Sequence, residues 1–220
     1  MNEKCRSSRG EPTRDALLDA ATDAFARFGF EAANLRQIAE AAGVNPALIG
    51  YHFKGKEGLY LAVFERILVH MAGVVEPLLA RIETGIWPAS PEQDRRERAL
   101  ELLLAMLEAV LTRLVHLQPA WGTLVVREMS SPTAAFDLLY GRLIGRGQRA
   151  LVSLLQVVRD EPDSERLRLL AATIFAQMLL VRHARAPFMR LLGWERIGDR
   201  ELAALVALLR RNVTLIALGD

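Results

Sequence analysis

The chain has 220 residues, of which 51% are hydrophobic and 25% charged, a composition typical of a globular protein with one large or two small domains. Its formal net charge of +2 is unevenly distributed: residues 1–58 are balanced, residues 59–139 have a net charge of −3, and residues 140–220 one of +5. This distribution excludes a polybasic nucleic-acid binder, so any DNA binding must depend on a few placed groups.

Targeting and redox signals are weak in this sequence. The first thirty residues are charged throughout, which does not fit a signal peptide, and no uncharged apolar run reaches the roughly 18 residues of a membrane span. The one cysteine, Cys5, excludes a disulfide framework within the chain and a cysteine-rich metal site. We therefore expect a cytoplasmic protein that contacts no membrane and uses no metal and no cofactor.

Helical patterns dominate the N-terminal part, and no segment alternates as a strand would. Over residues 13–28 apolar side chains recur at three- and four-residue steps, and Gly29 is expected to stop this helix. Asn34, followed by Gln37 three residues later, is typical of a capping box. It predicts a short second helix that ends at Gly43.

A third and a fourth helix follow closely. Asn45 is a good N-cap and Pro46 suits the first helical position, so a helix is predicted over about residues 46–52. Residues 55–57 open a longer helix, which Pro77 is expected to kink or divide.

Five further helices are predicted behind these four, after a loop at residues 84–91. A poorly ordered connection is expected over residues 193–198, and Asp199 is expected to cap the last helix. The approximate helical ranges are 91–117, 119–129, 131–158, 164–185 and 199–218. The sequence therefore predicts an all-α protein with about nine helices.

The stretch from Gly50 to Glu57 is one residue short of a nucleotide-binding P-loop, G-x-x-x-x-G-K-[ST]. A P-loop follows a buried strand and places a hydroxyl group on its magnesium ion. Here a helix cap precedes Gly50, and Glu57 stands at the hydroxyl position. The sequence disfavours a nucleotide site.

The second and third helices are joined by a tight turn at residues 42–44, which is the arrangement of a helix-turn-helix motif. Ala39 and Ile49 supply small and branched side chains where the helices must touch, and Phe53 shares the face of Ile49. Lys56 lies in the first turn of the next helix, where its ammonium and the free backbone amides can hold a phosphate. We expect that phosphate to belong to DNA.

Two sets of residues resemble the pattern of a known protein family. Within residues 13–60 the set is Arg14, Leu18, Ala20, Ala21, Phe25, Gly29, Ile38, Ala39, Ala42, Gly43, Val44, Tyr51, His52, Phe53, Lys56, Glu57, Gly58 and Leu59. It resembles the DNA-binding domain of the TetR family of bacterial transcriptional regulators. Asn34 departs from that pattern where a threonine is usual, and Gly50 departs where an aromatic residue is usual. The second set is similar to the CecR-type branch of the family: Arg127, Glu128, Pro132, Thr133, Phe136, Leu192, Gly193 and Trp194.

The resemblance implies an N-terminal three-helix helix-turn-helix DNA-binding domain over residues 1–58, with a flexible tail at 1–11. A helical domain for ligand binding and dimerisation is implied over residues 59–220. The basic tail residues Lys4, Arg6 and Arg9 either enter the minor groove or are disordered.

The DNA contacts that we expect come from the second and third helices and the start of the fourth. They are Arg36, Gln37, Asn45, Pro46, Ala47, Leu48, Gly50, Tyr51, His52 and Lys56. Tyr51, His52 and Lys56 are expected on phosphates, while Arg36, Tyr51 and DNA shape are expected to supply the specificity. The alternatives are a core position for Tyr51 or His52, and a solvated charge or a cap for Arg36 and Gln37.

The remaining helices are expected to hold an effector and a dimer interface. Two apolar stripes at helical spacing are the predicted interface: Leu167, Leu170, Ile174, Met178, Val181, Leu202, Leu205, Leu209, Val213 and Ile216. The predicted effector pocket is lined by Met106, Trp121, Arg127, Glu128, Phe136, Tyr140, Phe175 and Gln177. Ordinary core packing is the alternative for both sets, and ion pairing with neighbours is the alternative for Arg127 and Glu128.

Together with the resemblance, these features predict a DNA-binding transcriptional regulator: a repressor that binds a palindromic operator as a homodimer and is released by a small apolar or amphipathic effector. The alternative is a helical adaptor that binds only protein, with no DNA and no small-molecule ligand. An enzyme is not expected, because the four histidines lie far apart in the sequence and no nucleophile has an evident base.

Overall fold

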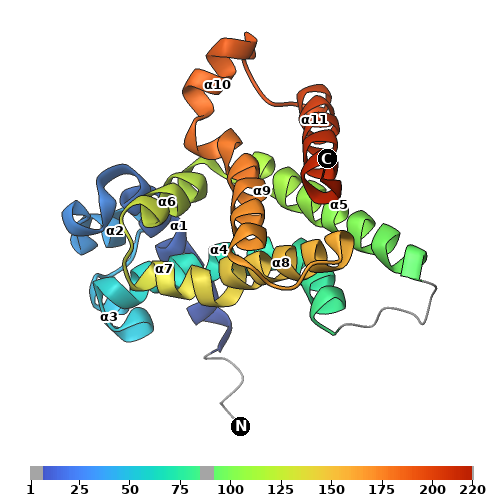
Figure 1. Ribbon diagram of the computed structural model, residues 1–220. Helices are drawn as coiled ribbons and strands as arrows, with labels where there is room; N and C mark the ends of the chain where they lie inside the picture. Colours follow the sequence, from blue (N-terminus) through green and yellow to red (C-terminus); the bar gives the residue numbers. More distant parts are fainter. Residues whose placement is uncertain (1–6, 85–91, 220) are drawn as a thin grey trace. The chain divides into compact units, whose positions relative to one another are not determined.

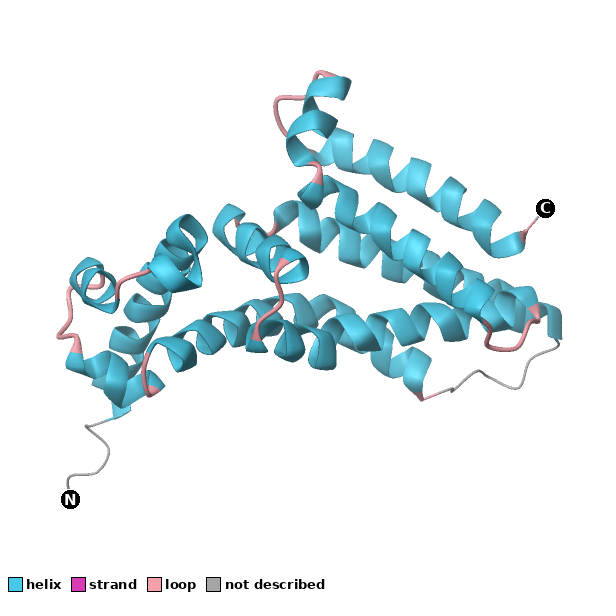
Figure 2. Ribbon diagram, turned by 60° about the vertical axis from the view of Figure 1, so that its left-hand side comes forward, coloured by secondary structure: helices cyan, strands magenta, loops and turns pink. Residues whose placement is uncertain are grey.

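The computed structural model describes residues 7–84 and 92–219, and every regular element within these ranges is a helix (Figures 1 and 2). The all-α prediction is confirmed. The tail residues Lys4 and Arg6, and most of the loop predicted at 84–91, lie outside the described residues.

Packing divides the chain into two compact units. The head unit comprises Met1–His70 and Gln118–Leu139, and the body unit comprises Met71–Leu117 and Tyr140–Asp220. The functional boundary expected at residue 58 remains a prediction, and it differs from this division because a later segment of the chain packs with the head.

The head unit contains six helical segments around one apolar core. They are α1 (Ser7–Ala32), α2 (Leu35–Ala41), α3 (Ala47–Phe53), the first part of α4 (Lys56–Glu83), α6 (Pro119–Ser130) and α7 (Ala134–Leu139). Their fully buried side chains include Leu17, Leu18, Phe25, Ile38, Ile49, Leu59 and Phe64. The edge-to-face pair of Phe25 and Tyr60, with ring centroids 4.9 Å apart, adds packing between α1 and α4.

Helix α1 starts earlier than expected and stops being helical at Gly29. The helix begins at Ser7, so the part of the expected flexible tail from residue 7 onward is helical. Gly29 lies within the span of α1 but has φ 81° and ψ 171°, which is not helical. The predicted stop at Gly29 is therefore confirmed, with one further turn to Ala32.

A kink or a division was expected at Pro77; helix α4 runs through this residue without a break, so the division is wrong and the kink stays a prediction. A proline removes one backbone hydrogen bond, here the one that the carbonyl of Gly73 would accept. The buried side chains of Val75 and Leu79 flank this position. Burial of apolar side chains on both sides of Pro77 holds the helix together despite the missing bond.

The body unit consists of the remainder of α4 and six further elements. They are α5 (Glu92–His116), the π-helical turn η1 (Tyr140–Ile144), α8 (Gly145–Arg159), α9 (Glu165–His183), α10 (Arg185–Leu192) and α11 (Asp199–Leu218). The helix predicted over residues 131–158 is thus α7, η1 and α8 in succession.

The connection before α11 is more ordered than expected, because it contains α10. Pro187 lies in the first turn of α10, where a missing N–H costs little. Gly193, with φ 65°, ends that helix. The cap of α11 is Gly198, one residue before the expected Asp199, and its N–H donates to Oε2 of Glu201 over 3.0 Å.

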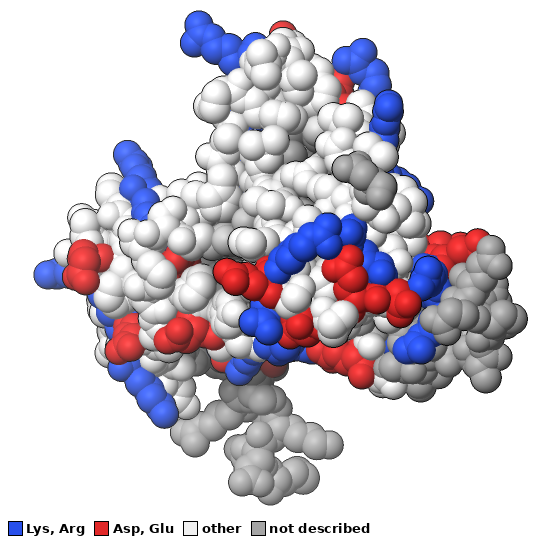
Figure 3. All heavy atoms as spheres, viewed as in Figure 1, with Lys and Arg blue, Asp and Glu red and all other residues white. Residues whose placement is uncertain are grey.

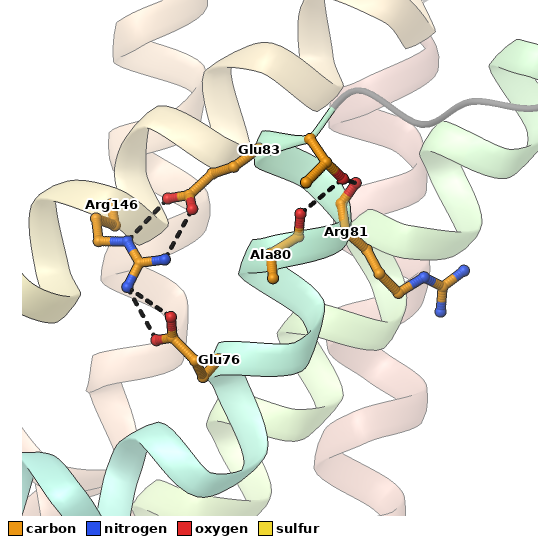
Figure 4. A network of polar contacts seen from close by, with 6 residues as sticks. Glu76, Ala80, Arg81, Glu83 and Arg146 are labelled. Atoms are coloured by element: carbon orange, nitrogen blue, oxygen red, sulfur yellow. Dashed lines mark hydrogen bonds and ion pairs between the residues drawn. The ribbon is translucent and has the colours of Figure 1, made fainter.

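Two arginines join helices within the body unit. Arg182 of α9 donates to the carbonyl oxygens of Leu114, Val115 and Leu117 at the end of α5, which lack helical donors. Arg146 of α8 binds two carboxylates of α4 (Figure 4). Its distances are 2.9 Å to each oxygen of Glu76, and 2.8 and 2.7 Å to the oxygens of Glu83.

Candidate DNA-binding surface

Helices α2 and α3 form a helix-turn-helix within the head unit. Ala39 and Ile49 are buried, as predicted for the side chains between the two helices. The turn is closed by a hydrogen bond of 2.9 Å from the N–H of Val44 to the carbonyl of Ala39. Gly43 has φ 67°, a left-handed conformation that glycine adopts without strain.

Both helices are capped by asparagine side chains, as the sequence predicted. Oδ1 of Asn34 accepts hydrogen bonds from the N–H groups of Arg36 and Gln37, at 2.8 and 3.4 Å. Oδ1 of Asn45 accepts one from the N–H of Ala47 over 2.9 Å. These caps satisfy amide donors that a helix start leaves free.

Helix α3 has one buried face and one open face. Ile49 and Phe53 anchor the buried face, and the guanidinium of Arg14 lies 5.4 Å from the centre of the Phe53 ring. On the open face Tyr51 is 80% exposed, which excludes the core position that was its alternative. His52 is half-buried between the rings of Tyr51 and Phe53. An exposed aromatic side chain on an anchored short helix is available to a partner.

The start of α4 lies directly after α3. Lys56 donates from Nζ to the carbonyl of Glu31 over 2.7 Å, and its ammonium lies 5.1 Å from the centre of the Phe30 ring. An ammonium has three donors, so this bond leaves two for an anion. The helix N-terminus supplies further amide donors at the same place.

All ten predicted DNA contacts are at least partly accessible in the described structure. Leu48, His52 and Lys56 are half-buried, and the other seven are exposed: Arg36, Gln37, Asn45, Pro46, Ala47, Gly50 and Tyr51. On the face shown in Figure 3, basic and acidic side chains are interspersed rather than gathered in one large basic patch. This face therefore offers discrete charged groups and no broad basic field.

The predicted effector pocket remains a prediction. Its eight residues are divided between the two units: Trp121, Arg127, Glu128 and Phe136 belong to the head unit, and Met106, Tyr140, Phe175 and Gln177 to the body unit. Met106 and Trp121 are buried, with Trp121 packed edge to face on His70. Tyr140 is 44% exposed, and Gln177 accepts a hydrogen bond from Asn212.

Arg127 and Glu128 have hydrogen-bond partners in the head unit, and their place in an effector pocket remains a prediction. Arg127 donates to the carbonyls of Phe25 and Ala26, at 2.7 and 3.4 Å. Glu128 is 1% exposed and accepts a hydrogen bond of 2.7 Å from the hydroxyl of Tyr60. Helix α6 is thereby fixed to α1 and α4. The sequence showed the Arg-Glu pair but carried no signal for these distant partners.

The predicted dimer stripes are mostly buried within the chain itself, so the prediction is wrong for those residues. The buried ones are Leu167, Ile174, Met178, Val181, Leu205, Leu209 and Val213, and the half-buried ones are Leu170, Leu202 and Ile216. Helices α9 and α11 also carry apolar side chains on their outward faces. Leu169, Leu180, Leu208, Leu215 and Leu218 are between 45% and 63% exposed.

No group of three or more His, Cys, Asp or Glu side chains within residues 7–84 and 92–219 could hold a metal ion. Helix α4 is long and apolar enough to cross a membrane by length and composition alone. Half of that stretch is buried inside the structure, which is typical of a core helix.

Two family models match the chain. Residues 17–63 match the bacterial regulatory proteins of the tetR family. Residues 99–219 match the C-terminal domain of the HTH-type transcriptional dual regulator CecR. The protein CecR of Shigella flexneri is 27% identical over 225 residues, which cover 100% of this chain and 97% of CecR.

Solved structures share the fold. A TetR-like transcriptional regulator from Rhodococcus sp. RHA1 has a TM-score of 0.65 and 20% identity, over 94% of this chain and 97% of that one. AibR, solved in complex with isovaleryl coenzyme A and operator DNA, has a TM-score of 0.63 and 14% identity, over 91% and 97% of the two chains.

The geometry and these matches define a helix-turn-helix DNA-binding transcriptional regulator. The second family model alone spans more than half of the chain. The chain belongs to the TetR family of bacterial regulators, and within it to the CecR type.

Proposed function

We propose that this protein is a cytoplasmic repressor that binds a palindromic operator as a homodimer through α3 and leaves it when a small effector binds. The observation that carries the proposal is the exposure of Tyr51 on a helix whose opposite face is anchored by Ile49 and Phe53. A helix held in this way by a helix-turn-helix can enter the major groove without rearrangement.

The proposed roles follow from position and chemistry. Tyr51, His52 and Lys56 contact phosphates, and the amides at the start of α4 support Lys56. Arg36 and Asn45 reach base edges, while Ala47 contacts a thymine methyl group. Few side chains on α3 can read bases, so DNA shape contributes to specificity.

The proposed dimer interface is the outward face of α9 and α11, because the inward faces are occupied by the chain's own core. At helical spacing this face presents Leu169, Ala172, Thr173, Ala176, Leu180, Ala204, Leu208, Leu215 and Leu218. Two such faces from two copies form a four-helix contact related by a two-fold axis. The same axis explains why the operator is palindromic.

Helix α4 is the element through which an effector acts in this proposal. It begins in the head unit at Lys56 and ends in the body unit at Glu83, so one helix carries both the phosphate-binding start and part of the body. The AibR structure contains both isovaleryl coenzyme A and operator DNA, so a protein of this fold can bind a small molecule and DNA together. This supports the proposal that an effector and an operator bind the same chain here. An effector favours a spacing of the two α3 helices that misses major grooves about 34 Å apart.

The test is selection of bound fragments from the host genome by the purified protein, with heparin present as a competitor. We expect a short palindrome to be enriched. The double variant Tyr51→Ala with Lys56→Ala should lose that enrichment, while the control Arg81→Ala, an exposed arginine of the body unit, should keep it.

Equal enrichment by the wild-type protein and the double variant would contradict the assigned surface. Binding of a host protein with no recovered DNA motif would instead support the adaptor alternative.

A further inference from the structure

The body unit has an open cleft of about 580 Å³ that the proposed function does not use. It is lined by one face of α5 and one residue of α4: Val74, Ala105, Glu108, Ala109, Thr112, Arg113 and His116. Its volume lies in the range of small-molecule sites. Ala105, Ala109, Thr112 and His116 recur at four- and three-residue steps, so they form one continuous strip of the helix.

Most polar groups of this cleft already have partners. The carboxylate of Glu108 lies 3.3 Å from Nη1 of Arg210 on α11. Nδ1 of His116 lies 2.8 Å from the carbonyl of Thr112. Val74, Ala105 and Ala109 add an apolar wall. The remaining polar side chains are Thr112 and Arg113.

Arg113 differs from the two arginines that join helices in the same unit, Arg146 and Arg182. Its Nε atom is buried and has no hydrogen-bond partner among residues 7–84 and 92–219. In contrast, Arg146 and Arg182 in the same unit donate to carboxylates and carbonyls. A buried donor without an acceptor is costly, so an acceptor brought by a ligand would be bound favourably. A guanidinium prefers an anionic acceptor, with which it can form two parallel hydrogen bonds.

Arg113 also lies against α4 where that helix lacks one backbone hydrogen bond. Its Nη2 atom is 3.9 Å from the position that a Cβ atom on Gly73 would take. The carbonyl of Gly73 lacks its helical donor, because Pro77 is four residues later and has no N–H. A group that moves the Arg113 side chain therefore acts on α4 where its backbone ladder is interrupted.

From this geometry we infer that the cleft binds an organic anion, with a carboxylate, sulfonate or phosphate group on Arg113 and an apolar body against Val74, Ala105 and Ala109. The assignment of this anion as the effector rests on the proposed function. The binding itself does not.

The test uses two dyes that differ in one group. 8-Anilinonaphthalene-1-sulfonate carries the anion, and N-phenyl-1-naphthylamine has the same aromatic body without it. Fluorescence titration of the folded full-length protein should show one sulfonate dye per chain. Arg113→Met should lower the affinity for the sulfonate dye about tenfold or more, which is the loss expected for a charge-assisted hydrogen bond. The affinity for the neutral dye should change less than about twofold.

Two further variants serve as an alternative test and as a control. Val74→Trp fills the cleft without removing a charge, so it should lower the affinity for both dyes. This variant tests the cleft if Arg113→Met does not fold. Arg149→Met is the matched control, because Arg149 lines a different cleft of about 500 Å³ between α8 and α9. It should leave both affinities unchanged.

Three results would overturn the inference. They are no binding of the sulfonate dye, an equal change in the affinity for both dyes in Arg113→Met, or a loss of dye affinity in Arg149→Met but not in Arg113→Met. Each can be observed without DNA, so failure here is distinct from failure of the proposed function. If dye binding behaves as expected but operator affinity is unaffected by the dye, the cleft is a ligand site that does not control DNA binding.

Discussion

The hydroxyl of Tyr60 on α4 donates a hydrogen bond of 2.7 Å to the carboxylate of Glu128 on α6, and both side chains are buried. Glu128 also accepts from the N–H and the hydroxyl of Thr133, each at 2.9 Å. Three donors therefore surround one buried carboxylate. With the bonds from Arg127 to the end of α1, this cluster holds α6 within the head unit.

The first prediction concerns Tyr60→Phe, which removes one of these donors and leaves the carboxylate buried. We expect the free energy of unfolding to fall by about 1–3 kcal/mol at pH 8, measured by urea denaturation. Tyr51→Phe is the matched control, because that tyrosine is 80% exposed, and it should change stability little.

The same pair gives a pH dependence. Burial, followed by the hydrogen bond to Glu128, raises the pKa of Tyr60 far above its ordinary value of 10. A raised pKa in the folded state contributes stability below pH 10, and this is lost as the unfolded tyrosine ionises above it. The stability gap between the wild type and Tyr60→Phe should therefore narrow above pH 10. A gap that stays constant or widens would contradict the buried hydrogen bond.

The second prediction concerns the ion pairs of Arg146 with Glu76 and Glu83 (Figure 4). The carboxylates are nearly half exposed, so Glu83→Gln should lower the free energy of unfolding by only about 0.5–1 kcal/mol at pH 7. The hydrogen bond from Arg146 lowers the pKa of Glu83. A lowered pKa contributes stability above the ordinary value of 4.5, which is lost as pH falls below it.

Thermal unfolding from pH 7 to pH 3 checks this prediction. The difference between the wild type and Glu83→Gln should close in acid, and it should shrink in 1 M salt. Glu101→Gln, at an exposed glutamate on α5, is the control and should show neither effect. A difference that persists at pH 3 would mean that packing of the side chain, and not its charge, stabilises α4.

The third prediction compares two glycines beside the DNA-binding surface. A Cβ atom on Gly58 would lie 1.8 Å from the carbonyl oxygen of Phe53, so Gly58→Ala forces the backbone to shift. A Cβ atom on Gly50 would meet nothing within 4 Å. Gly58→Ala should cost about 2–3 kcal/mol of stability, whereas Gly50→Ala should add up to about 1 kcal/mol by stiffening α3.

Denaturant unfolding of both variants measures the contrast. The Gly50 position departs from the family pattern, and its open surroundings show that no packing requires a glycine there. If Gly50→Ala stabilises the protein but weakens operator binding, the glycine is kept for the approach of DNA. Equal stability of the two variants would contradict the close approach of Gly58 to Phe53.

The helix-turn-helix could be predicted because its signals are local. Asn34 and Asn45 cap their helices through amides two or three residues away, and Gly43 takes the left-handed turn within the same segment. Ile49 and Phe53 are one helical turn apart and share a face by geometry alone. None of these inferences required knowledge of which helices pack together.

The effector and dimer residues could not be assigned in this way. Helical spacing shows that Leu205 and Leu209 share a face, but not whether that face meets its own chain or a second copy. The opposite side of α11 also carries exposed apolar side chains, Leu208 and Leu215. The partners of Arg127 lie about a hundred residues earlier in the chain, and only the packing of α6 on α1 reveals them.

The fourth prediction separates the two faces of α11. Leu208 is 57% exposed and Leu205 is 7% exposed, although they lie one turn apart. Leu208→Glu places a charge on the proposed dimer face, so the folded protein should become monomeric in sedimentation velocity experiments while its helical circular dichroism is retained. Leu205→Glu buries a charge in the protomer core and should instead cost several kcal/mol and unfold the chain.

Leu191→Glu on α10 is the control for added surface charge, because Leu191 is 83% exposed and lies outside the proposed face. It should leave the dimer intact. A dimer that survives Leu208→Glu but dissociates with Leu191→Glu would move the interface from α9 and α11 to α10. Monomeric Leu208→Glu should also bind a half-site far more weakly than the dimer binds the palindrome, because one α3 helix then acts without its partner.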